Sequence, residues 1–342
     1  MSSRVPLGDG VAIVRTGDGG EETTAGEAPL RPSTLPPFLR FPLVVVLSLS
    51  LSSLLYSLIA GFNGSEQDLA RVRRRLDSWW DVGALVGWRM FELGLGWFGN
   101  YDSYDLAALS LLSHSPPLYL LGTFYSIRSS TVVTSLVIDS LATYIPFRLL
   151  RPLSRAHAVT GSSNSAALPN KVLVTDPSIQ ILTTILAASI YDTTLFGAHK
   201  TYLTTYLVTY FTGIPSITAA YSATPFTLFP TTLLLGLAAK SFIYTPTAAV
   251  GPTPEDSKLA TFDPASATLV ETFWYNAWGY SSRAKVAIQR TATLVLVSGA
   301  NTFVQTYVTV QGVEALGALA YSGVWVVAAA VTGISLGVVG AV

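Results

Sequence analysis

Residues 41–62 read "FPLVVVLSLSLSSLLYSLIAGF" and carry no charged side chain. An α-helix needs roughly 20 apolar residues to cross the hydrocarbon core of a bilayer, and this run meets that length. Pro36, Pro37 and Pro42 stand where the helix is expected to begin, and proline is well tolerated in a first helical turn. The stretch therefore predicts a membrane-spanning helix, which we expect to act as an uncleaved signal anchor.

The composition of the whole chain points to the same class of protein. Half of the 342 residues are hydrophobic and only 12% are charged, against about 25% in an ordinary soluble domain. The formal net charge is zero and cysteine is absent, so the chain offers neither a basic surface for nucleic acid nor a thiol for catalysis or metal binding. We therefore expect an all-α polytopic transmembrane helical bundle in a lipid bilayer, with no nucleic acid, cofactor or metal.

Further apolar segments predict seven to nine spans in total. Two of them are interrupted: Pro116 and Pro117 predict either a kinked helix or a re-entrant pair of half-helices in 106–127, and Gly213 and Pro215 break 202–220. Arginine-rich segments at 71–75, 148–155 and 283–290 are typical of cytoplasmic loops. The candidate spans after the first are 79–98, 106–127, 131–150, 179–198, 202–220, 225–244, 291–310 and 318–342.

Polar segments divide the chain into regions. Residues 1–40 are rich in Gly, Thr, Pro and acids and predict a disordered tail. A membrane bundle is expected over 41–150, a polar linker loop over 151–176, and a second bundle over 177–342. In the second bundle, aromatic residues followed by Arg283, Lys285 and Arg290 predict an interfacial segment at 266–290. Gly333 and Gly337 have the GxxxG spacing that lets helices approach closely.

Arg89 and Glu92 are the most unusual residues of the candidate spans. They lie three positions apart, so they share one helical face and can pair. A charge at the centre of a bilayer costs roughly 2.5–3.5 kcal/mol on insertion scales, and pairing offsets part of that cost. Two interpretations stay open: an ion pair or interfacial face that fixes the helix, and a substrate or ion site inside the bundle.

Asp139 and His114 complete a candidate intramembrane polar site. Asp139 lies in the middle of a span with no cation within one helical turn, and Arg89 is the obvious long-range candidate to pair with it. A functional role and a structural tie both stay open for Asp139. His114 precedes the two prolines, where it can serve proton transfer or satisfy freed backbone groups. Asp192 is expected at a water-facing helix end. The predicted site is therefore Arg89, Glu92, His114 and Asp139, without a catalytic, cofactor or metal assignment.

The segment "DSYD" (Asp102 to Asp105) has the spacing of carboxylate pairs that hold metals. It has no accompanying motif, so we interpret it as a solvated loop. Neither HExxH nor a Walker loop occurs in the sequence. The absence of such motifs gives no support for an enzyme.

The Ser/Thr-rich spans, the segment "WGYSSR" at 278–283 and the Pro/Gly/Thr-rich tail resemble multi-pass membrane proteins of filamentous fungi. The resemblance implies neither an activity nor functional residues. We expect a non-enzymatic membrane subunit or scaffold in the endoplasmic reticulum or another endomembrane, with a membrane-protein partner or a second copy of itself. A transporter or channel for a small solute or ion is the alternative, and a lipid-modifying enzyme is the second alternative.

Overall fold

The computed structural model describes residues 36–63, 65–158, 170–264 and 266–341, and this part of the chain is helical with no β-strand. The N-terminal elements are α1 (Pro37–Asn63), α2 (Ser65–Ala70), α3 (Trp79–Phe98), α4 (Ser103–Phe124), α5 (Ser129–Leu150) and α6 (Arg155–Ala158). The middle elements are α7 (Lys171–Thr175), α8 (Pro177–Lys200), α9 (Leu203–Tyr210), α10 (Thr218–Ser222), α11 (Pro225–Ala239) and the π-helix η2 (Lys240–Tyr244). The C-terminal elements are α12 (Thr245–Ala249), α13 (Pro254–Ala260), α14 (Leu269–Trp278), α15 (Ser282–Val304), the π-helix η3 (Gln305–Thr309) and α16 (Ala315–Ala341).

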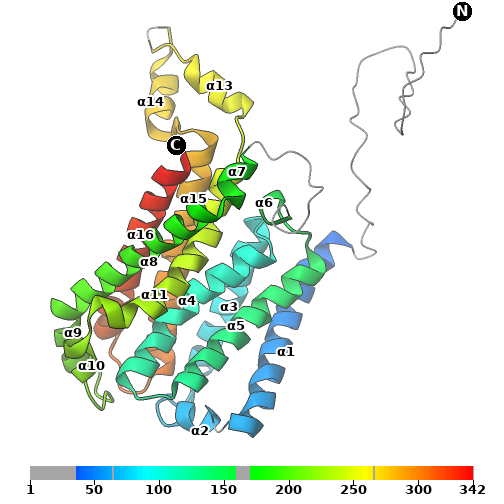
Figure 1. The fold of residues 1–342 in the computed structure, drawn as a ribbon. Coiled ribbons are helices and arrows are strands. Elements are labelled where there is room, and N and C mark those ends of the chain that lie inside the picture. Colours follow the sequence, from blue (N-terminus) through cyan, green and yellow to red (C-terminus); the bar gives the residue numbers. More distant parts are fainter. Residues whose placement is uncertain (1–35, 64, 159–169, 265, 342) are drawn as a thin grey trace, which may run out of the picture. The chain divides into compact units, whose positions relative to one another are not determined.

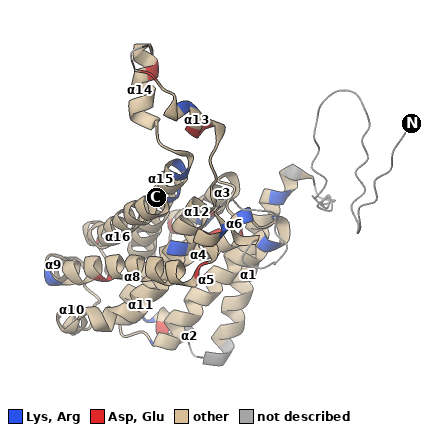
Figure 2. Ribbon diagram, turned by 45° about the horizontal axis from the view of Figure 1, so that its top comes forward, with Lys and Arg blue, Asp and Glu red and all other residues tan. Residues whose placement is uncertain are grey.

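Among these residues, five helical segments are long and apolar enough to cross a membrane: Phe38–Ala60, Ser129–Leu150, Pro177–Lys200, Pro225–Ala249 and Ala315–Gly340. Charged residues are sparse along these helices (Figure 2). The expected helical membrane class and a lipid bilayer environment fit this finding. The predicted count of seven to nine spans is not reached by these criteria and stays a prediction.

Of the two alternatives predicted for 106–127, the re-entrant pair of half-helices is wrong, because α4 is one helix that runs through both Pro116 and Pro117. Two prolines remove two backbone donors and so leave the carbonyls four residues earlier without a partner. These carbonyls belong to Leu112 and Ser113. Side chains of α15 supply the missing donors: Ser298 Oγ reaches Leu112 O at 3.4 Å, and Asn301 Nδ2 reaches Ser113 O at 2.8 Å. A neighbouring helix therefore makes the Pro-Pro sequence compatible with one helix.

Other predicted boundaries also change. The segment 202–220 is broken as expected, with α9 ending at Tyr210 and α10 beginning at Thr218. The interfacial segment 266–290 is not one element, because residues 282–290 belong to α15, which begins nine residues before the predicted span. Ser281 caps that helix by accepting a hydrogen bond from the backbone N–H of Ala284 at 3.3 Å. Helix α1 begins at Pro37, within the stretch 1–40 predicted as a tail, and the prediction of disorder for residues 1–35 lies outside the described part.

The long helices pack into one bundle around a core that draws on both predicted halves of the chain (Figure 1). The main packing pairs are α15 with α16, α8 with α11, and α4 with α5, while α1 packs on α5 and α4 contacts both α11 and α15. Gly333 and Gly337 of α16 lie against Thr291 and Ala287 of α15, which is the close approach that their spacing predicts. Beyond the end of the bundle at which α15 begins, α13 and α14 form an arm (Figure 1).

Candidate functional site

A polar cavity of about 230 Å³ lies between α1, α3, α4, α5 and η3. It adjoins a second cavity of about 380 Å³, with which it shares the lining residues Tyr56, Leu69 and Arg73. The π-helix η3 contributes to its wall, and π-turns inside α-helices are frequent at functional sites. We refer to this as the polar cavity, and its polar lining consists of Ser52, Tyr56, Arg73, Arg89, His114, Asp139, Gln305 and Thr309.

Arg89 and Glu92 of α3 form the ion pair that their spacing predicts, with 2.8 Å between Nη1 and Oε2. The pair is buried, since the side chains expose 15% and 3% of their surface. Hydroxyl groups of three neighbouring helices bond to Arg89 Nη2 and to Glu92 Oε1. Arg89 Nη2 donates to Thr143 Oγ1 at 2.6 Å and to Ser48 Oγ at 3.3 Å, and Ser113 Oγ donates to Glu92 Oε1 at 3.2 Å. The charges of this pair are therefore balanced, while Arg89 still reaches the cavity wall.

His114 lies on α4 and lines the same cavity. Its Nδ1 lies 2.9 Å from Ser110 O, which can only accept, so Nδ1 carries the hydrogen when the ring is neutral. Ser113 Oγ lies 3.0 Å from the same nitrogen. Among the described residues, Nε2 makes no hydrogen bond, so the neutral imidazole keeps one acceptor available. A His whose Nδ1 is fixed by its own helix is well suited to hold or transfer a proton at Nε2.

Asp139 lies on α5 and is half-buried at the cavity wall. The candidate ion pair with Arg89 is absent among the described residues. Instead, Tyr56 OH of α1 donates to Asp139 Oδ1 at 3.1 Å. The sequence-predicted residues are therefore brought together: Arg89, His114 and Asp139 line one cavity, and Glu92 lies directly behind Arg89.

The other five polar residues of the cavity are not identified by the sequence, and Arg73, Tyr56 and Gln305 show why. Arg73 belongs to an arginine cluster that was interpreted as a cytoplasmic loop marker, and the structure pairs this segment with the end of η3. The backbone N–H of Arg74 donates to Thr309 O at 2.7 Å, and that of Gln311 donates to Val72 O at 2.9 Å. Tyr56 and Gln305 lie in apolar stretches without any local signal, because their role depends on which helices become neighbours.

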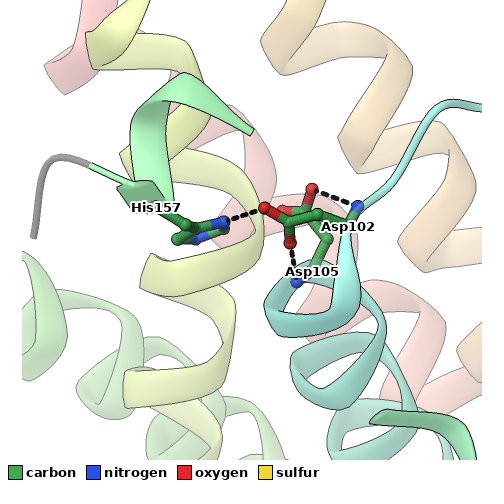
Figure 3. A group of neighbouring side chains, drawn as sticks. All are labelled: Asp102, Asp105 and His157. Atoms are coloured by element: carbon green, nitrogen blue, oxygen red, sulfur yellow. Dashed lines mark hydrogen bonds and ion pairs between the residues drawn. The ribbon is translucent and has the colours of Figure 1, made fainter. Parts of the chain in front are cut away.

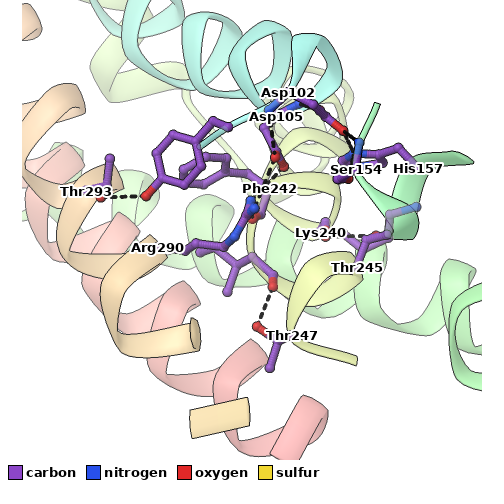
Figure 4. Close-up of polar contacts among 12 residues, drawn as sticks. Asp102, Asp105, Ser154, His157, Lys240, Phe242, Thr245, Thr247, Arg290 and Thr293 are labelled. Carbon is purple, nitrogen blue, oxygen red and sulfur yellow. Dashed lines mark hydrogen bonds and ion pairs between the residues drawn. The ribbon is translucent and has the colours of Figure 1, made fainter. Parts of the chain in front are cut away.

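A second polar cluster joins the start of α4 to α6 and α15 (Figures 3 and 4). Asp102 and Asp105 cap α4 reciprocally, with each carboxylate accepting the other's backbone N–H at 2.9 and 3.2 Å. Both side chains are buried, exposing 1% and 0% of their surface. The interpretation of "DSYD" as a solvated loop is therefore wrong. A capping box built from two Asp residues does not match the usual Ser/Thr-x-x-Glu pattern, so it was missed.

His157 of α6 closes this cluster on one side, with its Nδ1 2.8 Å from Asp102 Oδ2. The backbone N–H of Ser154 donates to the same oxygen at 2.9 Å. Burial alone raises the pKa of Asp102, but the hydrogen bond and charge of His157, with the bonds from Asp105 and Ser154, hold that pKa well below its usual range. Asp102 is therefore an ionised anchor for the segment after α5.

Distances alone would allow a metal ion in this cluster, because ligand atoms of Asp102, Asp105 and His157 lie within 4.8 Å of one another. The chemistry of the donor set does not favour one. All four carboxylate oxygens already accept hydrogen bonds, and Arg290 holds both oxygens of Asp105. An incoming cation would have to displace a buried guanidinium, so we interpret the cluster as a structural lock.

Asp192 was expected at a water-facing mouth, and this prediction is wrong. The residue lies inside α8 with only 4% of its surface exposed. His199, two turns further along, is equally buried and stacks on Tyr119 with ring centroids 6.2 Å apart. Neither residue lines the polar cavity.

Comparison of this chain with protein-family models, curated proteins and solved structures found no match.

Proposed function

We propose that this chain is an integral membrane protein that binds a small polar solute or ion in the polar cavity, as a transporter or channel for that solute. The observation that carries the proposal is the convergence of Arg89, His114 and Asp139 on one cavity, with Glu92 paired behind Arg89. Ionisable side chains in membrane bundles are costly, and they typically mark substrate, ion or proton pathways. A purely structural tie explains the Arg89–Glu92 pair, but it does not explain why Asp139 and His114 face the same cavity.

Thermal stability of the purified protein in mild detergent tests the proposal. We expect at least one member of a panel of small polar solutes and ions to raise the melting temperature, because a ligand that binds only the folded state stabilises it. Asp139→Asn and His114→Gln should lose that rise. Ser52 lines the cavity and Ser53 is exposed on the same helix, so Ser52→Val should weaken the effect while Ser53→Val should not.

Uptake of the stabilising solute into proteoliposomes then distinguishes a transporter or channel from a binding protein. We expect flux in the wild type and none in Asp139→Asn at equal protein density. If folded protein responds to no solute in the panel, and the cavity variants behave as the wild type does, the proposal is wrong.

A second candidate, the non-enzymatic membrane subunit or scaffold, is supported by the arm of α13 and α14. Apolar side chains line one face of α14 and are exposed, with Leu269 at 90% and Trp274 at 62%. Such a patch marks an interaction surface. We expect a protein partner or a second copy to co-purify at fixed stoichiometry with the wild type and to be lost from the Phe273→Ser, Trp274→Ser double variant.

We also propose that α3, α4 and α15 cross the bilayer. They contain 20, 22 and 23 residues, lengths that span about 30 Å. Together with the five apolar helices they would give eight spans, within the predicted seven to nine. Because the chain contains no cysteine, single cysteines placed in each connection can be labelled from either side of the membrane without a background signal.

The compartment that we propose is the endoplasmic reticulum or another endomembrane, in keeping with the resemblance to multi-pass proteins of filamentous fungi. Apolar helices support a membrane location, and imaging of the tagged protein beside compartment markers tests which membrane it is.

A further inference from the structure

We propose that the solute is a small zwitterion, whose anionic group binds Arg73 and whose cationic group binds Asp139. This inference rests on the proposed function, because it assigns a chemical class to the ligand of the same cavity. It follows from which charges in the cavity are already balanced within the protein and which are not.

Asp139 carries the unbalanced negative charge. Its carboxylate accepts one hydrogen bond, from Tyr56 OH at 3.1 Å, and it forms no ion pair with any described residue. A carboxylate that is half-buried beside apolar helices strongly favours a cationic or hydrogen-bonding partner. A ligand ammonium at the cavity wall would supply that partner.

Arg73 carries the unbalanced positive charge. Its guanidinium makes neither a hydrogen bond nor an ion pair within the described part of the chain, and it lines the cavity from an exposed position. The backbone around it is fixed, because Arg73 pairs with Val310 in an isolated bridge next to η3. Arg75 of the same cluster pairs with Asp77 instead, at 3.0 Å. Arg73 is thus held where its planar fork can bind a carboxylate or phosphate.

The remaining ionisable groups do not change this balance. Arg89 is neutralised by Glu92 at 2.8 Å, and His114 donates through Nδ1 to its own helix. Tyr56 lines the cavity together with Arg73 and donates a hydrogen bond to Asp139, so the two charges share one cavity wall. They nevertheless form no direct ion pair. A singly charged solute would leave one of them unmatched, whereas a zwitterion matches both.

The size and neutral lining of the cavity suit a small ligand. Its volume of about 230 Å³ is below the roughly 300–1,000 Å³ typical of sites for drug-sized molecules. Gln305 and Thr309 offer neutral hydrogen-bonding groups beside the charges. A free amino acid or betaine has the required chemistry, and so does the zwitterionic headgroup of a phospholipid.

The experiment compares ligands that differ in charge and little in size, using thermal stabilisation of the full-length protein in detergent. The probes are L-alanine and glycine betaine as zwitterions, propionate as the anion and n-propylammonium as the cation. We expect a zwitterion to stabilise the wild type at concentrations at least about tenfold lower than either singly charged probe. The reason is that a hydrogen bond to a charged group contributes about 1.5–3 kcal/mol, which corresponds to a tenfold or larger difference in affinity. Phosphocholine and micelles doped with phosphatidylcholine distinguish a free solute from a lipid headgroup, and a response to either supports the zwitterion.

Variants of Asp139 and Arg73 test which residue binds each charged group of the ligand. Asp139→Asn and Arg73→Gln should each weaken zwitterion binding by about tenfold or more. Arg71→Gln is the matched control, because Arg71 is an exposed arginine of the same cluster that does not line the cavity. Elution as a single species and an unchanged melting temperature without ligand show that a variant is folded.

The inference is overturned if a singly charged probe stabilises the protein as strongly as the zwitterions, or if both variants bind zwitterions as the wild type does. In the first case the cavity still binds a solute, so the proposed function as a transporter or channel remains and only the assignment of a zwitterion fails. A response to other members of the wider solute panel, with none to zwitterions, has the same meaning. Failure of every probe in the panel overturns both.

Discussion

Arg290 and Asp105 lie 185 positions apart in the chain and meet in a buried bidentate ion pair, with 2.6 Å between Nη1 and Oδ1 and 3.0 Å between Nη2 and Oδ2. Arg290 also donates to Phe242 O of η2 at 2.7 Å (Figure 4). The rings of Tyr101 and Phe242 face its guanidinium, with centroids at 4.9 and 5.2 Å. One side chain therefore fastens the start of α4, the π-turn η2 and helix α15 together.

Asp105→Asn should destabilise the protein severely, because it leaves the buried guanidinium of Arg290 without a counter-charge. Breaking a buried ion pair from one side costs roughly 3–5 kcal/mol. The measurement is the melting temperature in detergent, in a double-mutant cycle with Arg290→Met. We expect the double variant to be more stable than Asp105→Asn alone. If the losses in melting temperature of the two single variants simply add, the ion pair of Asp105 and Arg290 does not stabilise the fold as proposed.

The exposed pair of Lys285 and Glu255 is a suitable control. Its atoms lie 3.1 Å apart, but Glu255 exposes 69% of its side chain. Surface ion pairs contribute about 0–1 kcal/mol, so Glu255→Gln should leave the melting temperature almost unchanged.

Asp102 should make stability dependent on pH in the acid range. The folded protein holds the pKa of this buried carboxyl below its usual value of 3.8, because His157 and backbone donors outweigh the effect of burial. A lowered folded pKa stabilises the protein above the unfolded pKa and loses that contribution as pH falls through the folded value. The wild type should therefore lose stability below about pH 4 more steeply than Asp102→Asn, when melting temperature is recorded between pH 3 and 6. Parallel curves would contradict this assignment.

Arg151 should not be replaceable by lysine. Its guanidinium donates to the carbonyls of Gly96 and Trp97 near the end of α3, at 3.3 and 2.8 Å, and to that of Tyr101 in the following connection, at 3.0 Å. It also lies 4.4 Å from the centroid of the Trp97 ring. Lysine has no planar fork, so Arg151→Lys should cost about 1–3 kcal/mol. The exposed Arg155 makes none of these contacts, and Arg155→Lys measured in the same melting assay should have little effect.

Local spacing predicted the parts of the site that lie within one helix. The Arg89–Glu92 pair is three residues apart on α3, and the i,i+3 rule is sufficient to expect it. Hydropathy predicted most of the helices for the same reason, since each apolar run reports on its own segment. Arg89, His114 and Asp139 each stand out locally as an ionisable side chain within an apolar segment, and the structure places them around one cavity.

Contacts between distant segments could not be predicted. Asp102 and Asp105 follow the polar stretch "GNY", which is typical of a loop, and only Arg290 and His157 reveal that they are buried. The continuity of α4 likewise depends on Asn301, 188 positions from the carbonyl that it satisfies. Such pairings are set by tertiary packing, and a single sequence carries no local signal for them.

Gly236 should tolerate no side chain, because α11 approaches the backbone of α8 there. A Cβ atom would lie 2.5 Å from Thr184 O and 2.6 Å from the Ala188 nitrogen, and backbone atoms cannot move aside as a flexible side chain can. Gly236→Ala should destabilise the protein by roughly 1–3 kcal/mol through overpacking. Gly197 of α8 has open space around its Cβ position, so Gly197→Ala should be neutral or stabilising in the same melting assay.

Reversal of the Arg89–Glu92 pair separates a simple ion pair from a site with fixed geometry. Arg89→Glu or Glu92→Arg alone leaves two like charges three residues apart in a buried place, so protein levels should fall. The double reversal restores opposite charges, and an ion pair that only offsets burial would then be fully rescued. Arg89 also donates to Thr143 and Ser48, and Glu92 accepts from Ser113. In the reversed pair, a glutamate carboxylate would face the hydroxyl groups of Ser48 and Thr143, which now accept hydrogen bonds from Arg89. We therefore expect the level of folded protein in membranes to recover, while stabilisation by the solute does not. Full recovery of both would show that charge balance alone is required at this position.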